Sequence, residues 1–302
     1  MTPASFCGLV TAVQIRPISI KEKILAFVAL SKPRITCLVV LNAWAGFVLG
    51  VNGSWSYSLM LWTLLATALL SGGVAALNQY LERDRDRLMQ RTANRPLPAG
   101  TLSPRQALFF AFGLIVLAEV IFLLLVNWLS AMLGALVVVT YDWIYTPLKA
   151  RAWSSTLVGA VPGALPAVIG WLAAHGRWGA PAFILFSIVF LWQLPHVLAI
   201  ATLHRTGYSQ AGINLLPVGD RECALTSWEM VFVNLLLLPV SLLPAVFGMS
   251  GKLYVIPAAV LGILYLFGTV GLALNPTKPM AGRLLRLSVF YLPLLLAAMV
   301  VC

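Results

Sequence analysis

The stretch YSLMLWTLLATALLSGGVAALNQYLERDRDRLMQRTANRPL, residues 57–97, decides how this chain folds. Residues 57–80 are mainly apolar and long enough to cross a bilayer, which takes about 20 such residues. Residues 78–97 hold three acids, five arginines and two asparagines, in a chain that is only 10% charged. The stretch therefore predicts a membrane-crossing helix that ends in a dense cluster of charge.

The rest of the chain has the same apolar character. It is 302 residues long and 61% hydrophobic, whereas soluble domains are about 45–50% apolar. This composition excludes a pair of soluble domains and predicts an all-α membrane protein with nine spanning helices. The predicted spans are 34–51, 57–80, 105–126, 129–145, 155–174, 179–200, 227–248, 253–273 and 284–301, and the boundary between the third and fourth is a short turn at Asn127–Trp128.

Charge is distributed unevenly over the predicted loops. Nine spans place 18 of the 20 basic residues on the side of the N-terminus, and only Arg177 and Lys252 on the other side. The positive-inside rule makes the basic side cytoplasmic. We therefore expect a cytoplasmic N-terminal segment over residues 1–27 without a signal peptide, followed by one transmembrane domain over 28–302. The net charge of +11 then reflects membrane orientation, and no nucleic-acid partner is expected.

The charged segment contains a row of side-chain oxygens. Asn78, Glu82 and Asp86 are spaced by four and so share one face of a helix. Oxygen ligands suit Mg²⁺, which is usually held by one or two carboxylates together with substrate phosphates. A solvated, salt-bridged helix end explains the alternation of acids and arginines equally well. The pattern alone leaves both interpretations open.

Three further polar segments would lie at the same membrane face. Arg91, Asn94 and Arg95 follow the row, and arginine is a preferred partner of phosphate oxygens. Lys149 and Arg151 precede a span that is rich in glycine and proline, which favours close helix packing. The third segment covers residues 190–222, and it contains His196, Arg205 and Tyr208. A histidine there is either hydrogen-bonded to a neighbouring helix or a ligand for a metal or haem iron.

Taken together, these motifs resemble the UbiA-type intramembrane prenyltransferases, and within them the protohaem IX farnesyltransferase (haem O synthase) branch. The resemblance covers about residues 28–300. It rests on SKPRIT at 31–36, N-x-x-x-E-x-x-x-D at 78–86 followed by RT-x-NRPL, YT-x-LK-x-R at 145–151, G-x-x-PGALPAVIGW at 159–171, and LWQLPH followed by YSQAGINLLPV. The last two stretches and NRPL indicate the haem branch.

The resemblance implies a nine-helix bundle around a central cavity, in the bacterial inner membrane, with its active-site loops in the cytoplasm. It implies farnesyl transfer from farnesyl diphosphate to a vinyl group of haem B, with hydration to haem O, and haem A synthase or terminal oxidase assembly as partners. The oxygen row would bind Mg²⁺ and, with Lys149, carry catalysis. The substrate-binding residues implied are Arg34, Asp84, Arg91, Asn94, Arg95, Arg151, His196, Arg205 and Tyr208.

Two departures from the family pattern concern the acidic motifs. Glu82 stands where the first motif normally has aspartate, which keeps the charge but adds a methylene. Gly207 stands where the second motif has aspartate, and Asp220 and Glu222 are the nearby acids that would have to replace it. Two other functions therefore stay open: prenyl transfer to an aromatic acceptor such as a quinone precursor, and a transporter or haem-binding homologue that has lost catalysis.

Overall fold

The computed structural model describes residues 18–220 and 222–302. The predicted absence of a signal peptide concerns residues outside this part. Within it, nine helices are long and apolar enough to cross a membrane, and no strand is present, which confirms the predicted fold class. The membrane-length helices are α2 (Pro33–Gly50), α3 (Tyr57–Asp86), α4 with η1 (Pro104–Val126), α5 with η2 and α6 (Trp128–Leu148), α7 (Ser155–His175), α8 (Ala180–Leu203), α11 (Ala224–Val246), η3 with α12 (Lys252–Leu274) and α13 (Lys278–Val301).

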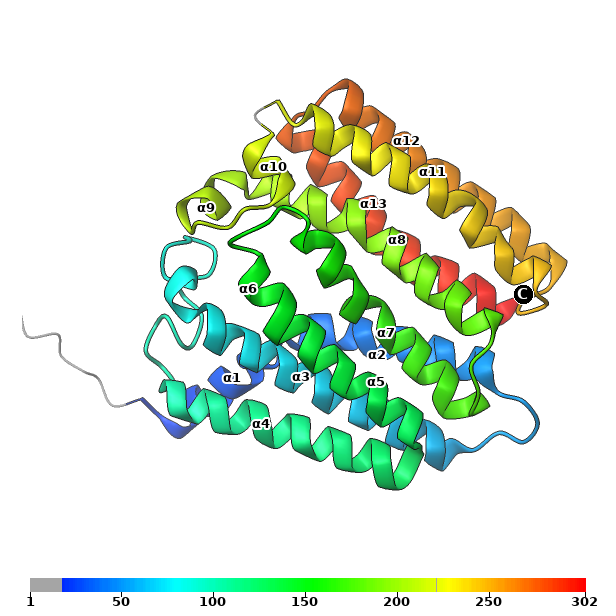
Figure 1. Cartoon of the computed structure of the whole chain (residues 1–302), viewed down its shortest axis with the longest axis horizontal. Coiled ribbons are helices and arrows are strands. Elements are labelled where there is room, and N and C mark those ends of the chain that lie inside the picture. Colours follow the sequence, from blue (N-terminus) through cyan, green and yellow to red (C-terminus); the bar gives the residue numbers. More distant parts are fainter. Residues whose placement is uncertain (1–17, 221) are drawn as a thin grey trace, which may run out of the picture.

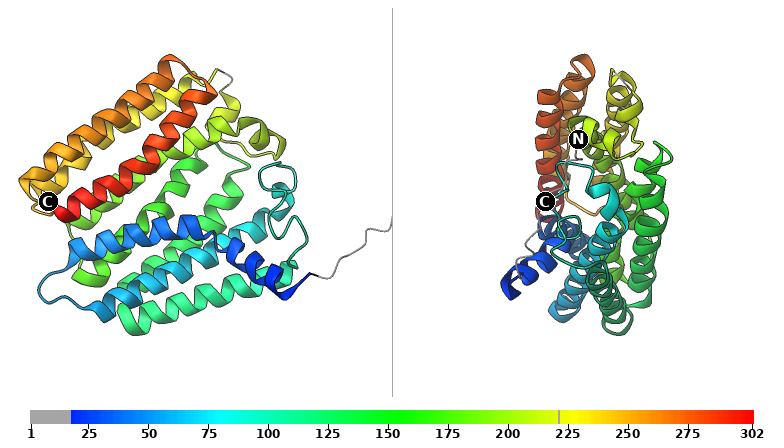
Figure 2. Two further views of the ribbon diagram at one scale, coloured as in Figure 1. Left: turned by 180° about the vertical axis from the view of Figure 1, so that it is seen from behind. Right: turned by 90° about the vertical axis from the view of Figure 1, so that its left-hand side faces the viewer.

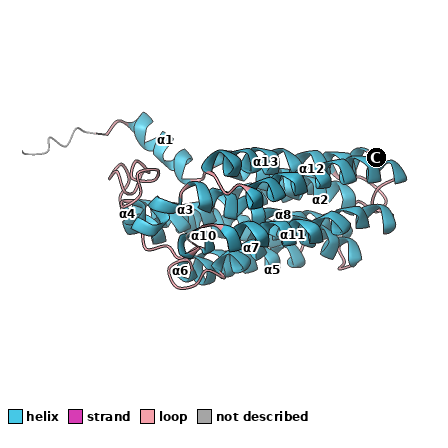
Figure 3. Ribbon diagram, turned by 90° about the horizontal axis from the view of Figure 1, so that it is seen from above, coloured by secondary structure: helices cyan, strands magenta, loops and turns pink. Residues whose placement is uncertain are grey.

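The remaining helices are short: α1 (Ile20–Leu30), α9 (Arg205–Gln210) and α10 (Leu216–Gly219). The segments around α9 and α10, the loop after α3 and the link between α6 and α7 lie together at one end of the bundle (Figure 1). The C-terminus lies at the opposite end. The long helices run side by side, and α1 lies at the loop-bearing end (Figure 3). The predicted polar segments therefore meet at one end of the molecule. The right-hand view of Figure 2, in which this end faces the viewer, shows the same arrangement.

The tight turn between the third and fourth spans is built by one asparagine. The Oδ1 atom of Asn127 accepts a hydrogen bond from the backbone N–H of Ser130 at 2.9 Å, and so caps the start of α5. Its Nδ2 donates to the carbonyl of Leu172 on α7 at 2.9 Å. The helix before the turn ends in a π-helical segment, η1 (Phe122–Val126). Asparagine is among the preferred N-cap residues, so this boundary falls where the sequence predicts it.

The closest helix contact lies between α2 and the central helix α7. A side-chain carbon added to Gly46 would collide with the carbonyl of Ala167, and one added to Gly170 would collide with the carbonyl of Ala43. In a membrane, helices associate through close packing, and small residues at the contact permit it. The glycine-rich sequence of α7 thus brings α2 against it, and α2 carries part of the cavity wall described below.

Replacing Gly170 with alanine is expected to destabilise the protein by about 1–3 kcal/mol, because the neighbouring backbone must move. The matched control is Gly113→Ala on α4, since a side-chain carbon at Gly113 meets no atom of the described residues within 4 Å. That control should be neutral or slightly stabilising, because alanine favours helix more than glycine does. Thermal unfolding in detergent measures both variants, and equal melting temperatures would contradict the packing argument.

Candidate active site

The last two turns of α3 carry the oxygen row into the interior. Asn78, Glu82 and Asp86 are 2%, 6% and 0% exposed, although two of them are acids. Helix α3 continues through Asp86, six residues beyond the predicted end of the span. A buried carboxylate is costly unless it is paired or hydrogen-bonded, so the partners of these side chains decide what the row can do.

Both carboxylates of the row are ion-paired with cations from other segments. Lys149 Nζ lies 3.0 Å from Glu82 Oε1, and Arg95 Nη1 lies 2.7 Å from Asp86 Oδ2. Burial opposes the charge of Lys149, but Tyr145 and Glu82 favour it and hold the lysine pKa well above its usual value. The ammonium also lies 4.7 Å from the centre of the Tyr145 ring. The loop after α3 and the end of α6 are thereby fixed beside the row.

A third cation, which the sequence analysis did not identify as a site residue, faces the remaining member of the row. Lys32 Nζ lies 3.5 Å from Asn78 Oδ1, while Asn78 Nδ2 donates to Thr146 Oγ1 at 3.0 Å. Lys32 has φ 46°, in the left-handed region, directly before Pro33 at the start of α2. Burial and the charges of Arg95 and Lys149 lower the pKa of Lys32 to about 8. Lys32 could have been identified from its position in the sequence, directly before the proline that begins a membrane-spanning helix.

Residues in and beside the short helices α9 and α10 form a second layer of polar contacts over the row. Arg91 Nη2 donates to the hydroxyl of Tyr208 on α9 at 3.1 Å, and its guanidinium lies 5.6 Å from the centre of that ring. The backbone N–H of Asn214 donates to the carbonyl of Lys149 at 2.7 Å. Arg205 Nη1 lies 3.8 Å from Cys223 Sγ. The loops after α3, α6 and α8 thus meet over one mouth.

Four of the predicted substrate-binding residues lie outside this cluster. Asp84 points outward and pairs with Arg83 at 3.6 Å, with 72% of its side chain exposed. Arg34, Asn94 and Arg151 are exposed as well. Their side chains do not join the buried row.

Gly207, which stands where the second acidic motif has aspartate, lies in an open position. A side-chain carbon at Gly207 would meet only Met89 among the described residues, at 3.9 Å, so there is room for a larger residue there. Asp220 does not replace it: its Oδ2 accepts from the backbone N–H of Thr226 at 2.8 Å, within the first turn of α11. Glu222 is exposed.

The structure suggests a different extra acid, Asp142. It lies in the π-helical segment η2 (Val139–Tyr145) and is 1% exposed. It precedes Thr146, the partner of Asn78, by four residues. Among the described residues, neither oxygen of Asp142 has a hydrogen-bond partner, and Asp86 Oδ1 has none either. Buried carboxylate oxygens without a partner are ligands of the kind that Mg²⁺ takes, and Asp86 and Asp142 each supply at least one among the described residues.

No three histidine, cysteine or acidic side chains within the described ranges converge on a ready-made metal centre. Mg²⁺ is usually held by one or two carboxylates and completed by water and substrate phosphates. The fit of the row to Mg²⁺ therefore requires a ligand that brings phosphate oxygens.

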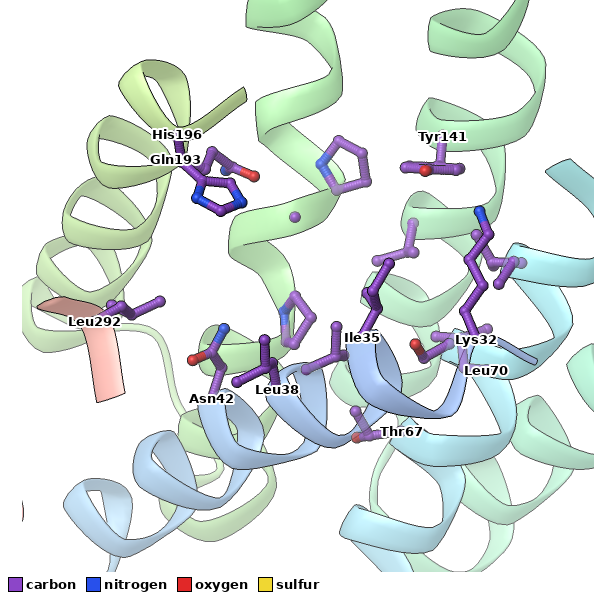
Figure 4. Close-up of a pocket in the computed structure, with 18 of the residues that line it drawn as sticks. Lys32, Ile35, Leu38, Asn42, Thr67, Leu70, Tyr141, Gln193, His196 and Leu292 are labelled. Carbon is purple, nitrogen blue, oxygen red and sulfur yellow. The ribbon is translucent and has the colours of Figure 1, made fainter. Parts of the chain in front are cut away.

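A mainly apolar cavity of about 300 Å³ begins at Lys32 and runs between the helices. Its walls come from α2, α3, α5, η2, α7, α8 and α13, and Figure 4 shows Ile35, Leu38 and Leu70 on one side and Gln193 and His196 on the other. The cavity thus connects the polar mouth with a histidine in the interior of the bundle. The cavity is an apolar path that leads away from the charged end of the bundle.

The fold and the site define an integral membrane protein with a charged mouth that opens into an apolar cavity between its helices. The sequence matches the UbiA prenyltransferase family over residues 39–293. A relative from Solibacter usitatus (strain Ellin6076), called protoheme IX farnesyltransferase, is 43% identical over 282 residues, which are 90% of this chain and 97% of that protein. The chain belongs to the UbiA prenyltransferase family and is a prenyltransferase, which confirms the resemblance seen in its motifs.

Solved structures share the fold at low identity. A structure of digeranylgeranylglyceryl phosphate synthase has a TM-score of 0.75 and 18% identity, and covers 93% of this chain and 98% of its own. A UbiA homolog from Archaeoglobus fulgidus bound to DMAPP and Mg²⁺ has a TM-score of 0.64 and 17% identity, with coverages of 91% and 99%. These two likenesses concern the fold alone.

Proposed function

We propose that this protein transfers the farnesyl group of farnesyl diphosphate to a vinyl group of haem B and that water adds, giving haem O. The observation that carries the proposal is the buried oxygen row, framed by Lys32, Arg95 and Lys149, at the mouth of an apolar cavity. The name shared by relatives about 40% identical to this chain supports the choice of haem and farnesyl.

The cations of the mouth bind the diphosphate. Lys149 and Arg95 neutralise the carboxylates in the ligand-free protein, and they are the nearest charges for phosphate oxygens when those carboxylates take a metal. Arg91, Arg205 and Tyr208 lie in the covering segments and complete the phosphate contacts. Neutralising the negative charge that develops on the diphosphate lowers the barrier to breaking the allylic C–O bond.

Asn78, Glu82 and Asp86 are the residues that would hold Mg²⁺, and Asp142 is a further buried acid whose oxygens have no hydrogen-bond partner among the described residues. The ion supplies positive charge to the leaving diphosphate. Such a site would be completed by substrate phosphates, and this would explain why the protein supplies only part of the ligands.

The cavity separates the reacting carbon from bulk water. Its apolar walls on α2, α3 and α13 accommodate the prenyl tail, and exclusion of water protects the allylic cation until the vinyl group attacks it. The cation that forms next to the porphyrin is then captured by one water molecule, which loses a proton. His196 lies on the opposite wall, and we assign it to haem binding.

The protein is an integral membrane protein, and we place it in the bacterial inner membrane with its N-terminus and active-site loops in the cytoplasm. The clustering of basic loops at one end supports this orientation. Haem A synthase or terminal oxidase assembly would receive the product. Residues 28–302 then form one transmembrane catalytic domain.

Binding of farnesyl diphosphate in the absence of metal is expected to weaken as the pH rises through about 8, the value to which the pKa of Lys32 is lowered. Below this pH the side chain is charged and attracts phosphate; above it, binding must first take up a proton. Calorimetric titration in EDTA from pH 7 to 9.5 measures the effect. Lys32→Arg should remove it, because arginine stays charged throughout. An equal pH dependence in the two proteins would rule out Lys32 as its source.

A comparison of acceptors tests the proposed function. Purified protein is incubated with farnesyl diphosphate, Mg²⁺ and either haem B or 4-hydroxybenzoate, and the products are identified by mass. The proposal predicts farnesylated, hydrated haem and an unchanged aromatic acid. Prenylation of the aromatic acid alone would instead establish the related activity, and no product with either acceptor would favour a binding protein without catalysis.

A further inference from the structure

The wall of the cavity opposite Lys32 carries His196, which is hydrogen-bonded to a residue of a second helix. His196 Nδ1 on α8 lies 2.7 Å from the hydroxyl oxygen of Ser288 on α13. Ser288 is fully buried, whereas His196 is half-buried and lines the cavity. Figure 4 shows the imidazole ring beside Gln193, facing the space between the helices. Among the described residues the other ring nitrogen, Nε2, has no hydrogen-bond partner.

The direction of this hydrogen bond follows from the proton of the serine. A serine hydroxyl has one proton to donate. Ser288 donates it to the carbonyl of Leu285 in the preceding turn, at 2.7 Å. Its oxygen therefore accepts from His196, so that Nδ1 carries the imidazole proton and Nε2 carries a lone pair. In a neutral imidazole only one nitrogen is protonated, and the partner of the other decides which.

The ring is also held in orientation. Trp192, one turn earlier on α8, stacks on His196 with ring centres 5.0 Å apart and an angle of 22° between the planes. Trp192 Nε1 donates to the backbone carbonyl of Ser288 at 2.8 Å. One residue of α13 thus anchors both rings and leaves only the Nε2 edge of the histidine toward the cavity.

We propose that Ser288 is a positioning residue that fixes His196 as the Nδ1–H tautomer and presents the Nε2 lone pair to the iron of a metalloporphyrin in the cavity. The ligand role rests on the proposed function, since it requires a haem acceptor, whereas the tautomer does not. A histidine that ligates a metal almost always donates its other N–H to a fixed partner, and the serine supplies that partner here. A lone pair in an apolar cavity also prefers a Lewis acid to no partner at all.

Nuclear magnetic resonance of ¹⁵N-histidine tests the tautomer in the substrate-free protein. The chain has only three histidines, so His175→Gln and His204→Gln leave His196 as the single labelled ring. We expect a proton on Nδ1 in this parent protein and a loss of that preference in Ser288→Ala. A parent whose proton resides on Nε2 would overturn the assignment.

The chain offers a closely matched control in Ser241 on α11. It is also fully buried, its hydroxyl donates to the carbonyl three residues earlier at 2.7 Å, and its own carbonyl accepts a side-chain hydrogen bond, from Tyr254. It has no histidine partner among the described residues. Ser241→Ala should cost similar stability and leave the His196 tautomer unchanged. An equal change in the two alanine variants would reduce Ser288 to a packing role and overturn the proposal.

Titration with ferric haem B then tests the ligand role by absorption and electron paramagnetic resonance. Ser288→Ala is expected to bind haem about 10- to 100-fold more weakly than Ser241→Ala, the usual range for losing the partner of a metal-bound histidine. His196→Ala should lose the histidine-ligated spectrum. A protein that keeps the Nδ1–H tautomer but binds no haem would refute the haem acceptor and leave the tautomer standing. Haem binding with an unchanged spectrum in His196→Ala would overturn the ligand role alone.

Discussion

Asp86→Asn is expected to lower the turnover number about 10²- to 10³-fold, the usual cost of removing one electrostatic contact to a developing charge. Asp86 is fully buried, pairs with Arg95 through Oδ2, and has a second oxygen, Oδ1, without a partner among the described residues. The amide keeps the shape but removes the negative charge that a metal requires. Haem O formation under saturating Mg²⁺ measures the loss, and near-normal turnover would eliminate Asp86 as a ligand.

The control for this variant lies two residues earlier on the same helix. Asp84→Asn removes the same charge, but Asp84 is exposed, and its one ion pair among the described residues is with Arg83. It should retain turnover within about twofold, because exposed ion pairs contribute little. Binding of Mn²⁺ in the presence of a non-reactive farnesyl diphosphate analogue, followed by paramagnetic resonance, should weaken in Asp86→Asn and not in Asp84→Asn. Equal losses would indicate a general effect of charge at the helix end.

Lys149→Met is expected to lower turnover by a similar factor, about 10²- to 10³-fold, and to weaken diphosphate binding. Its ammonium lies 3.0 Å from Glu82 and is the charge that stays protonated throughout the accessible pH range. Loss of the lysine leaves a buried carboxylate unpaired, which destabilises the fold by about 3–5 kcal/mol. Steady-state kinetics with farnesyl diphosphate as the varied substrate measures the functional loss.

The structural cost of Lys149→Met can be separated from the chemical one. In the double variant Glu82→Gln with Lys149→Met the buried carboxylate at position 82 is gone as well, so stability should recover, while activity should stay low because both a phosphate-binding cation and a metal ligand are missing. Arg151→Gln in the same loop is the control, because Arg151 is exposed. Full recovery of turnover in the double variant would show that Lys149 only neutralises Glu82 and that Glu82 is not a metal ligand.

Much of the fold follows from local sequence. The nine spans and the Asn127 turn depend on runs of apolar residues and one capping side chain, which the chain displays directly. The ends of the spans were less predictable. Helix α3 continues to Asp86 because distant cations neutralise its buried acids, and the π-helical segments η1 and η2 depart from the ordinary helical period.

The site residues that share one helix were predictable from the sequence, whereas the contacts between different helices and loops were not. Spacing by four placed Asn78, Glu82 and Asp86 on one face, whereas the pairing with Lys32, Lys149 and Arg95 depends on three other segments. The SKPRIT motif holds both Lys32 and Arg34, and it is Lys32, with its left-handed backbone, that lies at the row. The role of Ser288 could not be predicted, because a serine in an apolar helix indicates no function until its partner on another helix is known.

The central claim is that cleavage of farnesyl diphosphate at the polar mouth is coupled to alkylation of haem in the cavity. The most direct measurement counts both products in one reaction of the purified protein with Mg²⁺, farnesyl diphosphate and haem B in ¹⁸O-labelled water. We expect one diphosphate to be released for each farnesylated haem, ¹⁸O to appear in the new hydroxyl group, and almost no diphosphate to be released without haem. Diphosphate released at the same rate without haem, or no farnesylated haem at all, would contradict it.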